Sequence, residues 1–474
     1  MFEQIKKLSL QSLVYGVGHI MARLITFLLL PLYTNIFTTE EYGVVSLAYA
    51  FIGFALILFR YGTDTALMKF YIDSDGKNKN AYFSSIWSLQ LLTSLVFSGA
   101  LILSAPFLTP LLLGSTDPFI LKMIAVIIAL DVLWNIPVLI LRAEERPSMF
   151  VGMNLSNVIA TIVFNIYFVI FLGLGIDGVF YGNIVASSLM NIIAIPILWN
   201  RLKIKYCSKE VLKKVFNFSL PFVPAGLFTM IMELADRYLL EWLVGTSAVG
   251  IYSAGYKLGM FGLLMVMGFN MGWTPFFLKK GKEKDAKELF SRVTCYFLGM
   301  FGFVAIFLTL TMDDLVQLRI GNYSFFGEAF WSSTEIVPII LLAYFFFGFY
   351  VLQMPAVYMP ELTKWVPVYR ALGAAANVLF NIYFIPKYGV LGAAWSTMAA
   401  YAIMSITVYL ISHKHYTIPF RWRGISFPIV AMIGAMALQG SALVEIVYLL
   451  SYVVLWFFIV ADAKEKQALL NKLK

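Results

Sequence analysis

The sequence predicts an all-α membrane protein with 14 transmembrane helices. Of its 474 residues, 61% are hydrophobic and only 13% are charged, whereas soluble globular proteins carry about 25% charged residues. The apolar residues lie in runs close to the roughly 20 residues that a helix needs to cross a bilayer. These runs lack the alternation of transmembrane β-strands, so the sequence predicts a polytopic helical bundle.

Fourteen such runs follow one another along the chain. The first lacks a small-residue cleavage signal and is too long for a signal peptide, so we expect it to be retained. The third is long and interrupted by Pro106 and Pro110, and the thirteenth is short. The approximate limits are 9–36, 43–68, 82–113, 119–142, 150–173, 177–199, 216–240, 249–276, 290–312, 333–358, 365–385, 389–411, 424–440 and 443–462.

The basic residues of the loops predict the orientation. With both termini inside, the cytoplasmic segments contain 28 of the 35 Lys and Arg residues, including RLKIK at 201–205 and KKGKEK at 279–284. The external segments contain only Lys122, Arg319 and Lys387. This asymmetry follows the positive-inside rule and favours an even number of spans. We expect a bacterial or archaeal cytoplasmic membrane, both termini in the cytoplasm, and contact of the basic loops with anionic lipids. The net charge of +9 therefore needs no nucleic-acid partner.

The chain contains an internal repeat. FNIYF occurs at 164–168 and at 380–384, and YGVVSLAY at 42–49 matches VGIYSAGY at 249–256. Spans 1–6 therefore match spans 7–12 in order and in the same orientation. We expect two pseudo-symmetric six-helix lobes with a substrate site at their interface, as in parallel-repeat transporters. The predicted divisions are 1–205 for the N-lobe, 206–415 for the C-lobe, and 416–474 for spans 13 and 14 with a cytoplasmic tail.

Placing a charged residue inside a membrane span costs free energy, so such residues usually have a function. Arg23 is too far from either end of its span to reach water, and His19 lies one turn before it. Structural alternatives stay open for others: Arg60 with Asp64 at i+4, and Arg237 with Glu233 at i−4, form possible ion pairs. The cavity candidates are Arg23, His19, Arg60, Lys257 and Arg237, and the ion-coupling candidates are Asp131, Glu233, Asp236 and Asp64.

The other polar residues of the spans are expected to have structural roles or leave more than one role open, and none forms a catalytic motif. Asn165 and Asn381, at the centres of the repeated motif, are expected to hydrogen-bond between helices. Asp131 has two open interpretations, an ion or proton site or a fixed pair with Arg23. The sequence has no nucleotide-binding or metal-binding motif, and its two cysteines lie beside basic stretches. We expect no cofactor, no metal and no catalytic residue.

Three segments carry a family resemblance: TTEEYGVVSLAY, ADRYLLEWLVGTSAVGIYSAGYKLG at 235–259, and IPKYGVLGAAWSTMAA at 385–400. They resemble the polysaccharide transporter family of the multidrug/oligosaccharidyl-lipid/polysaccharide exporter superfamily. The resemblance implies a flippase, not an enzyme, for undecaprenyl-diphosphate-linked oligosaccharides such as O-antigen repeat units, with two lobes around a cationic cavity. It also implies a role in lipopolysaccharide or other cell-surface polysaccharide biosynthesis, beside a polymerase and a chain-length regulator. We expect a monomer.

Two other functions stay open. A cation-coupled multidrug efflux transporter would share the two-lobe organisation. A membrane-embedded polysaccharide polymerase or ligase would need catalytic carboxylates in an external loop. The largest external segment, 313–332, offers Asp313, Asp314 and Glu328 for that role.

Overall fold

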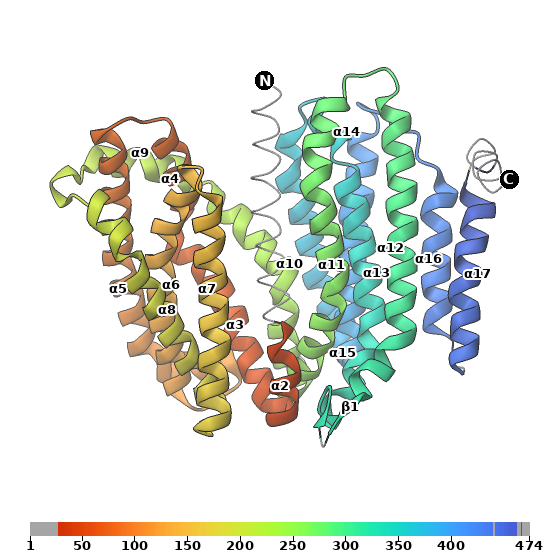
Figure 1. Ribbon diagram of the computed structural model, residues 1–474, viewed down its shortest axis with the longest axis horizontal. Coiled ribbons are helices and arrows are strands. Elements are labelled where there is room, and N and C mark those ends of the chain that lie inside the picture. The colour runs from red at the N-terminus through yellow and green to blue at the C-terminus, as the bar shows by residue number, and fades with distance from the viewer. Residues whose placement is uncertain (1–26, 322, 439–440, 462–465, 467–474) are drawn as a thin grey trace. The chain divides into compact units, whose positions relative to one another are not determined.

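The computed structural model describes residues 27–321, 323–438, 441–461 and 466, and these residues are almost entirely helical (Figure 1). The predicted all-α membrane fold is confirmed. Among the described residues, ten helices are long and apolar enough to cross a membrane, or 11 if one bent helix pair counts as a single span. The count of 14 stays a prediction.

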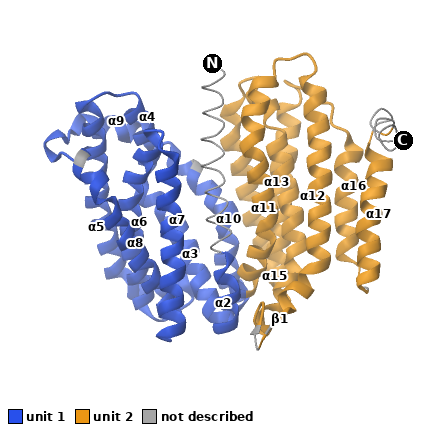
Figure 2. Ribbon diagram, in the orientation of Figure 1, with its two compact units in different colours: residues 1–250 blue, residues 251–474 orange. Residues whose placement is uncertain are grey.

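The chain divides into two compact units, residues 1–250 and 251–474 (Figure 2). Helix α10, which the sequence analysis assigned to the second lobe, packs on α3 and belongs to unit 1. The lobe limits at 205 and 415 stay predictions.

Unit 1 is a bundle in which α5 packs on α6, α8 packs on both α6 and α7, and α3 contacts α5 and α10. Its elements are α2 (Leu29–Ile36), α3 (Thr39–Arg60), α4 (Thr63–Ile72), α5 (Lys77–Leu113), α6 (Pro118–Ala143), α7 (Pro147–Ile166), the π-helix η1 (Tyr167–Phe171), α8 (Gly175–Arg201), the 3-10 turn η2 (Ile204–Tyr206), α9 (Lys209–Ser219), α10 (Phe222–Leu243) and the start of α11 (Thr246–Lys280).

Local chemistry explains where the unit 1 helices begin and break. Thr38 and Glu41 form a reciprocal capping box at the start of α3. The predicted span 43–68 is two helices, because Tyr61 and Gly62 both adopt positive φ angles, 33° and 76°. A Cβ at position 62 would also meet the backbone of Ser219, so a glycine is required at this break. In contrast, α5 runs through Pro106 and Pro110 as one helix, since membrane helices tolerate internal prolines.

Unit 2 is organised around α12, which packs on α13, α16 and α17. α13 is the most buried candidate span and α17 the least. The elements are the rest of α11, α12 (Ala286–Gln317), the two-residue strands β1 (Arg319–Ile320) and β2 (Tyr323–Ser324), the 3-10 helix η3 (Glu328–Ile336), α13 (Val337–Leu352), α14 (Pro355–Tyr358), the 3-10 turn η4 (Thr363–Trp365), α15 (Val366–Ser412), α16 (Trp422–Met436) and α17 (Ala442–Val460).

The repeated motif makes the same local contact in each unit. In unit 1, Gly178 of α8 lies against the backbone of Phe168, the last residue of the first FNIYF. In unit 2, Gly392 lies against the backbone of Phe384, the last residue of the second copy. The second copy reaches this contact through a kink in α15 at Gly389, whose φ angle is 55°. The two copies therefore share a helix-to-helix contact as well as a sequence.

Candidate functional site

Two predicted cavity residues, His19 and Arg23, lie outside the described residues. Arg60 is the last residue of α3, where a cation complements the helix dipole. Its guanidinium lies 3.4 Å from the Asp64 carboxylate, and both side chains are partly buried. Gln90 donates a hydrogen bond to the Arg60 carbonyl oxygen. The structure therefore brings the predicted pair of Arg60 and Asp64 together.

A second charged group lies on α10. Arg237 is buried and forms an ion pair of 2.9 Å with the buried carboxylate of Asp236. It also donates a hydrogen bond to the backbone carbonyl of Glu233, one turn earlier. Arg237 therefore contacts Glu233 through the backbone carbonyl of that residue, and the carboxylate in its ion pair is that of Asp236. Lys257 is half-buried on α11 in unit 2.

Asp131 is held by a hydrogen-bond network inside unit 1. One of its carboxylate oxygens accepts hydrogen bonds from Ser187 Oγ of α8, at 2.6 Å, and from Trp134 Nε1, at 3.0 Å. One turn away on α8, Asn183 donates to the hydroxyl of Tyr49 on α3, at 2.9 Å. A carboxylate at the junction of three membrane helices can hold a proton or a cation.

Sequence reasoning missed the partners of Asp131, although a signal was present. Asn183, Ser187 and Asn191 follow one another at intervals of four residues, which places them on one face of α8. Asn191 also donates a hydrogen bond to α6, at the carbonyl of Leu130. A polar stripe on an apolar helix predicts a polar partner on a neighbouring helix, and Asp131 is that partner.

The two motif asparagines have different environments. Asn165 accepts a hydrogen bond of 2.6 Å from the hydroxyl of Tyr33 on α2 and donates to the carbonyl of Thr161. Asn381 donates to the carbonyl and side-chain oxygens of Asn377, both within α15. Both motif asparagines are fully buried. The contacts of Asn165 link α7 to α2.

One contact joins equivalent positions of the repeat in the first turns of α3 and α11. A Cβ at Gly43 would overlap the carbonyl of Thr246, and a Cβ at Gly250 would overlap the carbonyl of Thr39. The hydroxyls of Thr39 and Ser247 lie 2.7 Å apart. Both helices approach so closely that only glycine fits at these crossing points.

A charged cluster closes the opposite end of unit 1. Arg201, at the end of α8, makes a bidentate contact with Glu144, with nitrogen–oxygen distances of 2.8 Å to both carboxylate oxygens. Tyr71 also donates a hydrogen bond to Glu144, at 2.8 Å. Burial alone would raise the pKa of the Glu144 carboxyl, but the hydrogen bonds and the Arg201 charge outweigh it and hold that pKa below its usual value.

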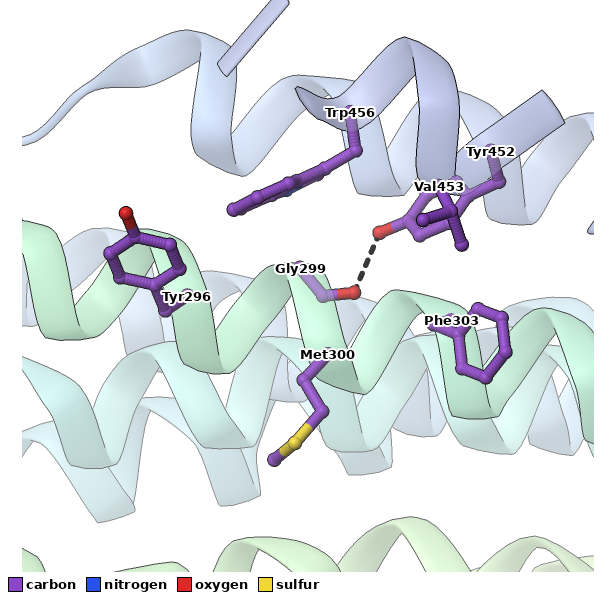
Figure 3. Close-up of a pocket in the computed structure, with 7 residues that line it drawn as sticks. All are labelled: Tyr296, Gly299, Met300, Phe303, Tyr452, Val453 and Trp456. Atoms are coloured by element: carbon purple, nitrogen blue, oxygen red, sulfur yellow. Dashed lines mark hydrogen bonds between the residues drawn. The ribbon is translucent and has the colours of Figure 1, made fainter. Parts of the chain in front are cut away.

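Unit 2 has an apolar groove of about 240 Å³ between α12 and α17 (Figure 3). Tyr452 donates a hydrogen bond of 2.8 Å to the carbonyl of Gly299 across this groove. The indole nitrogen of Trp456 is buried without a hydrogen-bond partner and lies close to Gly299. The lining residues are Tyr296, Gly299, Met300, Phe303, Tyr452, Val453 and Trp456.

The acidic residues that the sequence offers to a polymerase or ligase are exposed to solvent. Asp313 and Asp314 are exposed at the end of α12. Glu328 pairs with Arg319 at 3.2 Å, and both side chains are more than two-thirds exposed. A catalytic carboxylate is expected in a pocket that shifts its pKa, so this arrangement gives a polymerase or ligase no support.

Comparison with known proteins gives three kinds of similarity. A family model described as "Polysaccharide biosynthesis protein" matches residues 11–280. The chain is 21% identical over 266 residues to the uncharacterized membrane protein YabM of Bacillus subtilis, covering 53% of this chain and 46% of YabM. It is 22% identical over 285 residues to the probable flippase AglR of Haloferax volcanii, covering 59% and 56%. The chain thus spans about half the length of these relatives.

Two solved structures share the fold. The lipid II flippase MurJ, in an inward closed conformation, matches with a TM-score of 0.73 over 94% of this chain and 97% of its own, at 16% identity. An inward-facing multidrug resistance MATE family transporter of the MOP superfamily matches with a TM-score of 0.67 over 88% and 99%, at 13% identity. At these identities the similarity shows the fold.

Proposed function

Since the chain belongs to the family of polysaccharide biosynthesis proteins, we propose that it is a flippase for undecaprenyl-diphosphate-linked oligosaccharide repeat units. It carries them across the cytoplasmic membrane by alternating access, for cell-surface polysaccharide biosynthesis such as that of O-antigen. The family predicted from the sequence is confirmed, and the chain is a multi-pass membrane protein with the transporter fold of the exporter superfamily. The probable flippase AglR among its relatives supports the flippase activity.

The observation that carries the proposal is the contact of α3 with α11 through equivalent repeat positions. The two proposed pseudo-symmetric lobes are divided near residues 205 and 415. They would rock about such a contact, because helix ends that pack at glycine can separate and rejoin as rigid elements. Thr39 and Ser247 then close one face of the transporter when their hydroxyls meet.

The substrate head needs positive charge. Arginine suits bidentate binding of phosphate, and Arg23 is the proposed main contact of the diphosphate, with His19 and Lys257 as further candidates. Arg60 and Arg237 each have a carboxylate partner, so we assign them a supporting role.

The lipid tail needs an apolar surface. The groove between α12 and α17 is open and lined mainly by aromatic and aliphatic side chains. We propose that it accommodates part of the polyprenyl chain while the head group crosses. Spans 13 and 14 of the sequence analysis thus serve the tail, and the two six-helix lobes serve the head.

The ion-coupling candidates suggest how transport is driven. The hydrogen-bonded carboxylate of Asp131 joins α6 to α8, so its protonation or cation binding would change a contact between helices. Glu233, Asp236 and Asp64 are weaker candidates. The same network favours a second function, cation-coupled efflux of small amphipathic compounds.

A reconstituted assay tests the proposal. Proteoliposomes receive a fluorescent undecaprenyl-diphosphate oligosaccharide, and a membrane-impermeant quencher reports its movement between leaflets. We expect Arg23→Ala to lose movement and Lys122→Ala, its control, to keep it. In a variant without Cys207 and Cys295, a disulfide between Thr39→Cys and Ser247→Cys should stop movement until it is reduced.

Two other outcomes would contradict the flippase. Export of a cationic dye with no movement of the lipid would select the efflux function. Formation of new glycosidic bonds in the same liposomes would select a polymerase or ligase.

A further inference from the structure

The segment between α8 and α9 forms a fixed basic platform at one end of unit 1. The chain 202–219 contains five lysines and one glutamate. Its backbone is attached to α5 by buried serines: Ser84 accepts a hydrogen bond from the Lys203 amide at 2.8 Å, and Ser85 accepts one from Ser208 at 3.1 Å. The bidentate contact of Arg201 with Glu144 holds the start of the segment.

The lysines of the platform have two different environments. Lys214 lies over the rings of Phe70 and Tyr82, 4.8 and 5.8 Å from their centres, so it attaches α9 to the unit. Four others have exposed side chains: Lys203, Lys205, Lys209 and Lys213. On α9, Lys209 and Lys213 are one turn apart, on the face opposite the buried Val215.

Large apolar side chains are exposed beside these lysines. Trp199 is 78% exposed and Ile204 is 76% exposed, at the same end of α8 as Lys203. Just after α9, Leu220 and Phe222 are also exposed. Amphipathic side chains beside cations are typical of helices at the boundary of headgroups and acyl chains, and tryptophan is enriched there.

Another basic segment of the chain has a different charge balance. Residues 279–288 also contain five lysines, but with three acidic residues among them. Lys280 is paired with Glu283 at 2.8 Å. The number of lysines therefore does not distinguish the two segments; the distinguishing feature is the excess of lysine over acidic residues in 202–219.

We propose that the 202–219 platform binds anionic phospholipid headgroups, with Trp199 and Ile204 inserted at the headgroup boundary. A lysine near an anionic surface strengthens binding by about fivefold, and four fixed lysines act together. The binding partner is a lipid surface, because the apolar side chains flank the lysines where the spanning helix ends. This inference concerns lipid binding and does not depend on the transported substrate.

Quenching of tryptophan fluorescence tests the platform. The full chain, purified in mild detergent, is titrated with phosphatidylglycerol brominated near the headgroup, or with the matching phosphatidylcholine. We expect stronger quenching by phosphatidylglycerol, with the difference lost in Trp199→Phe and weakened by added salt.

Matched variants decide whether the four lysines are responsible. Changing Lys203, Lys205, Lys209 and Lys213 to Gln should weaken the preference for phosphatidylglycerol at least tenfold. Changing the same four to Arg should keep it. The control changes Lys279, Lys282, Lys284 and Lys287 to Gln and should keep it as well. If the fourfold variant unfolds at a lower temperature, K205Q/K213Q replaces it and should lose part of the preference.

Three results would overturn the proposal. One is equal quenching by the two lipids. Another is an equal loss in the control variant, which would indicate unspecific attraction. The third is a preference that survives the Gln variants, which would place lipid binding elsewhere on the chain.

Discussion

Gly43 and Gly250 occupy equivalent positions of the internal repeat and pack against each other's helices. Gly43 lies against the carbonyl of Thr246, and Gly250 lies against the carbonyl of Thr39. These carbonyls also belong to equivalent residues, since both pairs are 207 positions apart. The two matching segments, YGVVSLAY and VGIYSAGY, therefore contact each other reciprocally in the structure.

This contact predicts a specific sensitivity to one methyl group. Gly43→Ala or Gly250→Ala would place a Cβ on a backbone carbonyl that cannot rotate away, so the two helix ends must separate. We expect a loss of about 1–3 kcal/mol in unfolding free energy. Thermal unfolding of the purified variants in detergent measures it.

Two other glycines provide the control. Gly99 in α5 and Gly152 in α7 have open space where a Cβ would be added. Alanine there should leave stability unchanged or raise it by up to about 1 kcal/mol, because alanine favours helix more than glycine does. Equal effects at all four glycines would remove the special role of the contact.

A second prediction concerns Glu144 and pH. Its pKa is lowered in the folded state, so its contribution to stability is present above the unfolded pKa of about 4.3 and is lost as pH falls through the folded value. We expect Glu144→Gln to lower the unfolding free energy by about 2 kcal/mol at neutral pH. The difference from the unmodified chain should shrink below about pH 4.

Unfolding curves at several pH values check this. Glu283→Gln, which removes the exposed pair with Lys280, is the control and should cost under about 1 kcal/mol. A pH-independent effect of Glu144→Gln would mean that the Glu144 charge does not contribute as described.

The fold could be predicted from the sequence largely because hydropathy and charge act over whole helices. Span 13, flagged as short, corresponds to the 15-residue α16. The break at Tyr61 was missed, since the apolar residues on both sides of it were joined into one span, 43–68, and only Gly62 hints at a turn. The bend of 46° between α9 and α10 lies at Pro221, a residue type that removes a backbone hydrogen bond and can bend a helix.

The site was less predictable, because its contacts join residues far apart in sequence. Arg60 with Asp64 could be predicted since the partners are one helical turn apart. Glu144 and Arg201 are 57 positions apart, and Asp131 and Ser187 are 56 apart. No local pattern links such residues; only the packing of α6 on α8 brings them together.

A third prediction concerns the attachment of α17 to α12. Tyr452→Phe removes the hydrogen bond to the Gly299 carbonyl and leaves the ring in place. We expect a loss of about 1 kcal/mol in unfolding free energy, measured by thermal unfolding. Tyr388→Phe, at an exposed ring, is the control and should have no effect. If both variants behave alike, the hydrogen bond does not attach α17.

The last prediction separates ion coupling from structure at Asp131. Asparagine has nearly the shape of aspartate and can still accept hydrogen bonds from Ser187 and Trp134, but it cannot take up a proton. If Asp131 couples transport to protons, Asp131→Asn should keep its stability within about 1 kcal/mol and lose the dependence of transport on the pH gradient.

The matched measurement uses Asp64→Asn, whose carboxylate pairs with Arg60. Transport in proteoliposomes with and without an imposed pH gradient, together with thermal unfolding, gives both readouts for both variants. Retained gradient dependence in Asp131→Asn would leave the carboxylate a structural role between α6 and α8. A stability loss much above 1 kcal/mol without a change in gradient response would lead to the same conclusion, because the charge would then serve packing and not coupling.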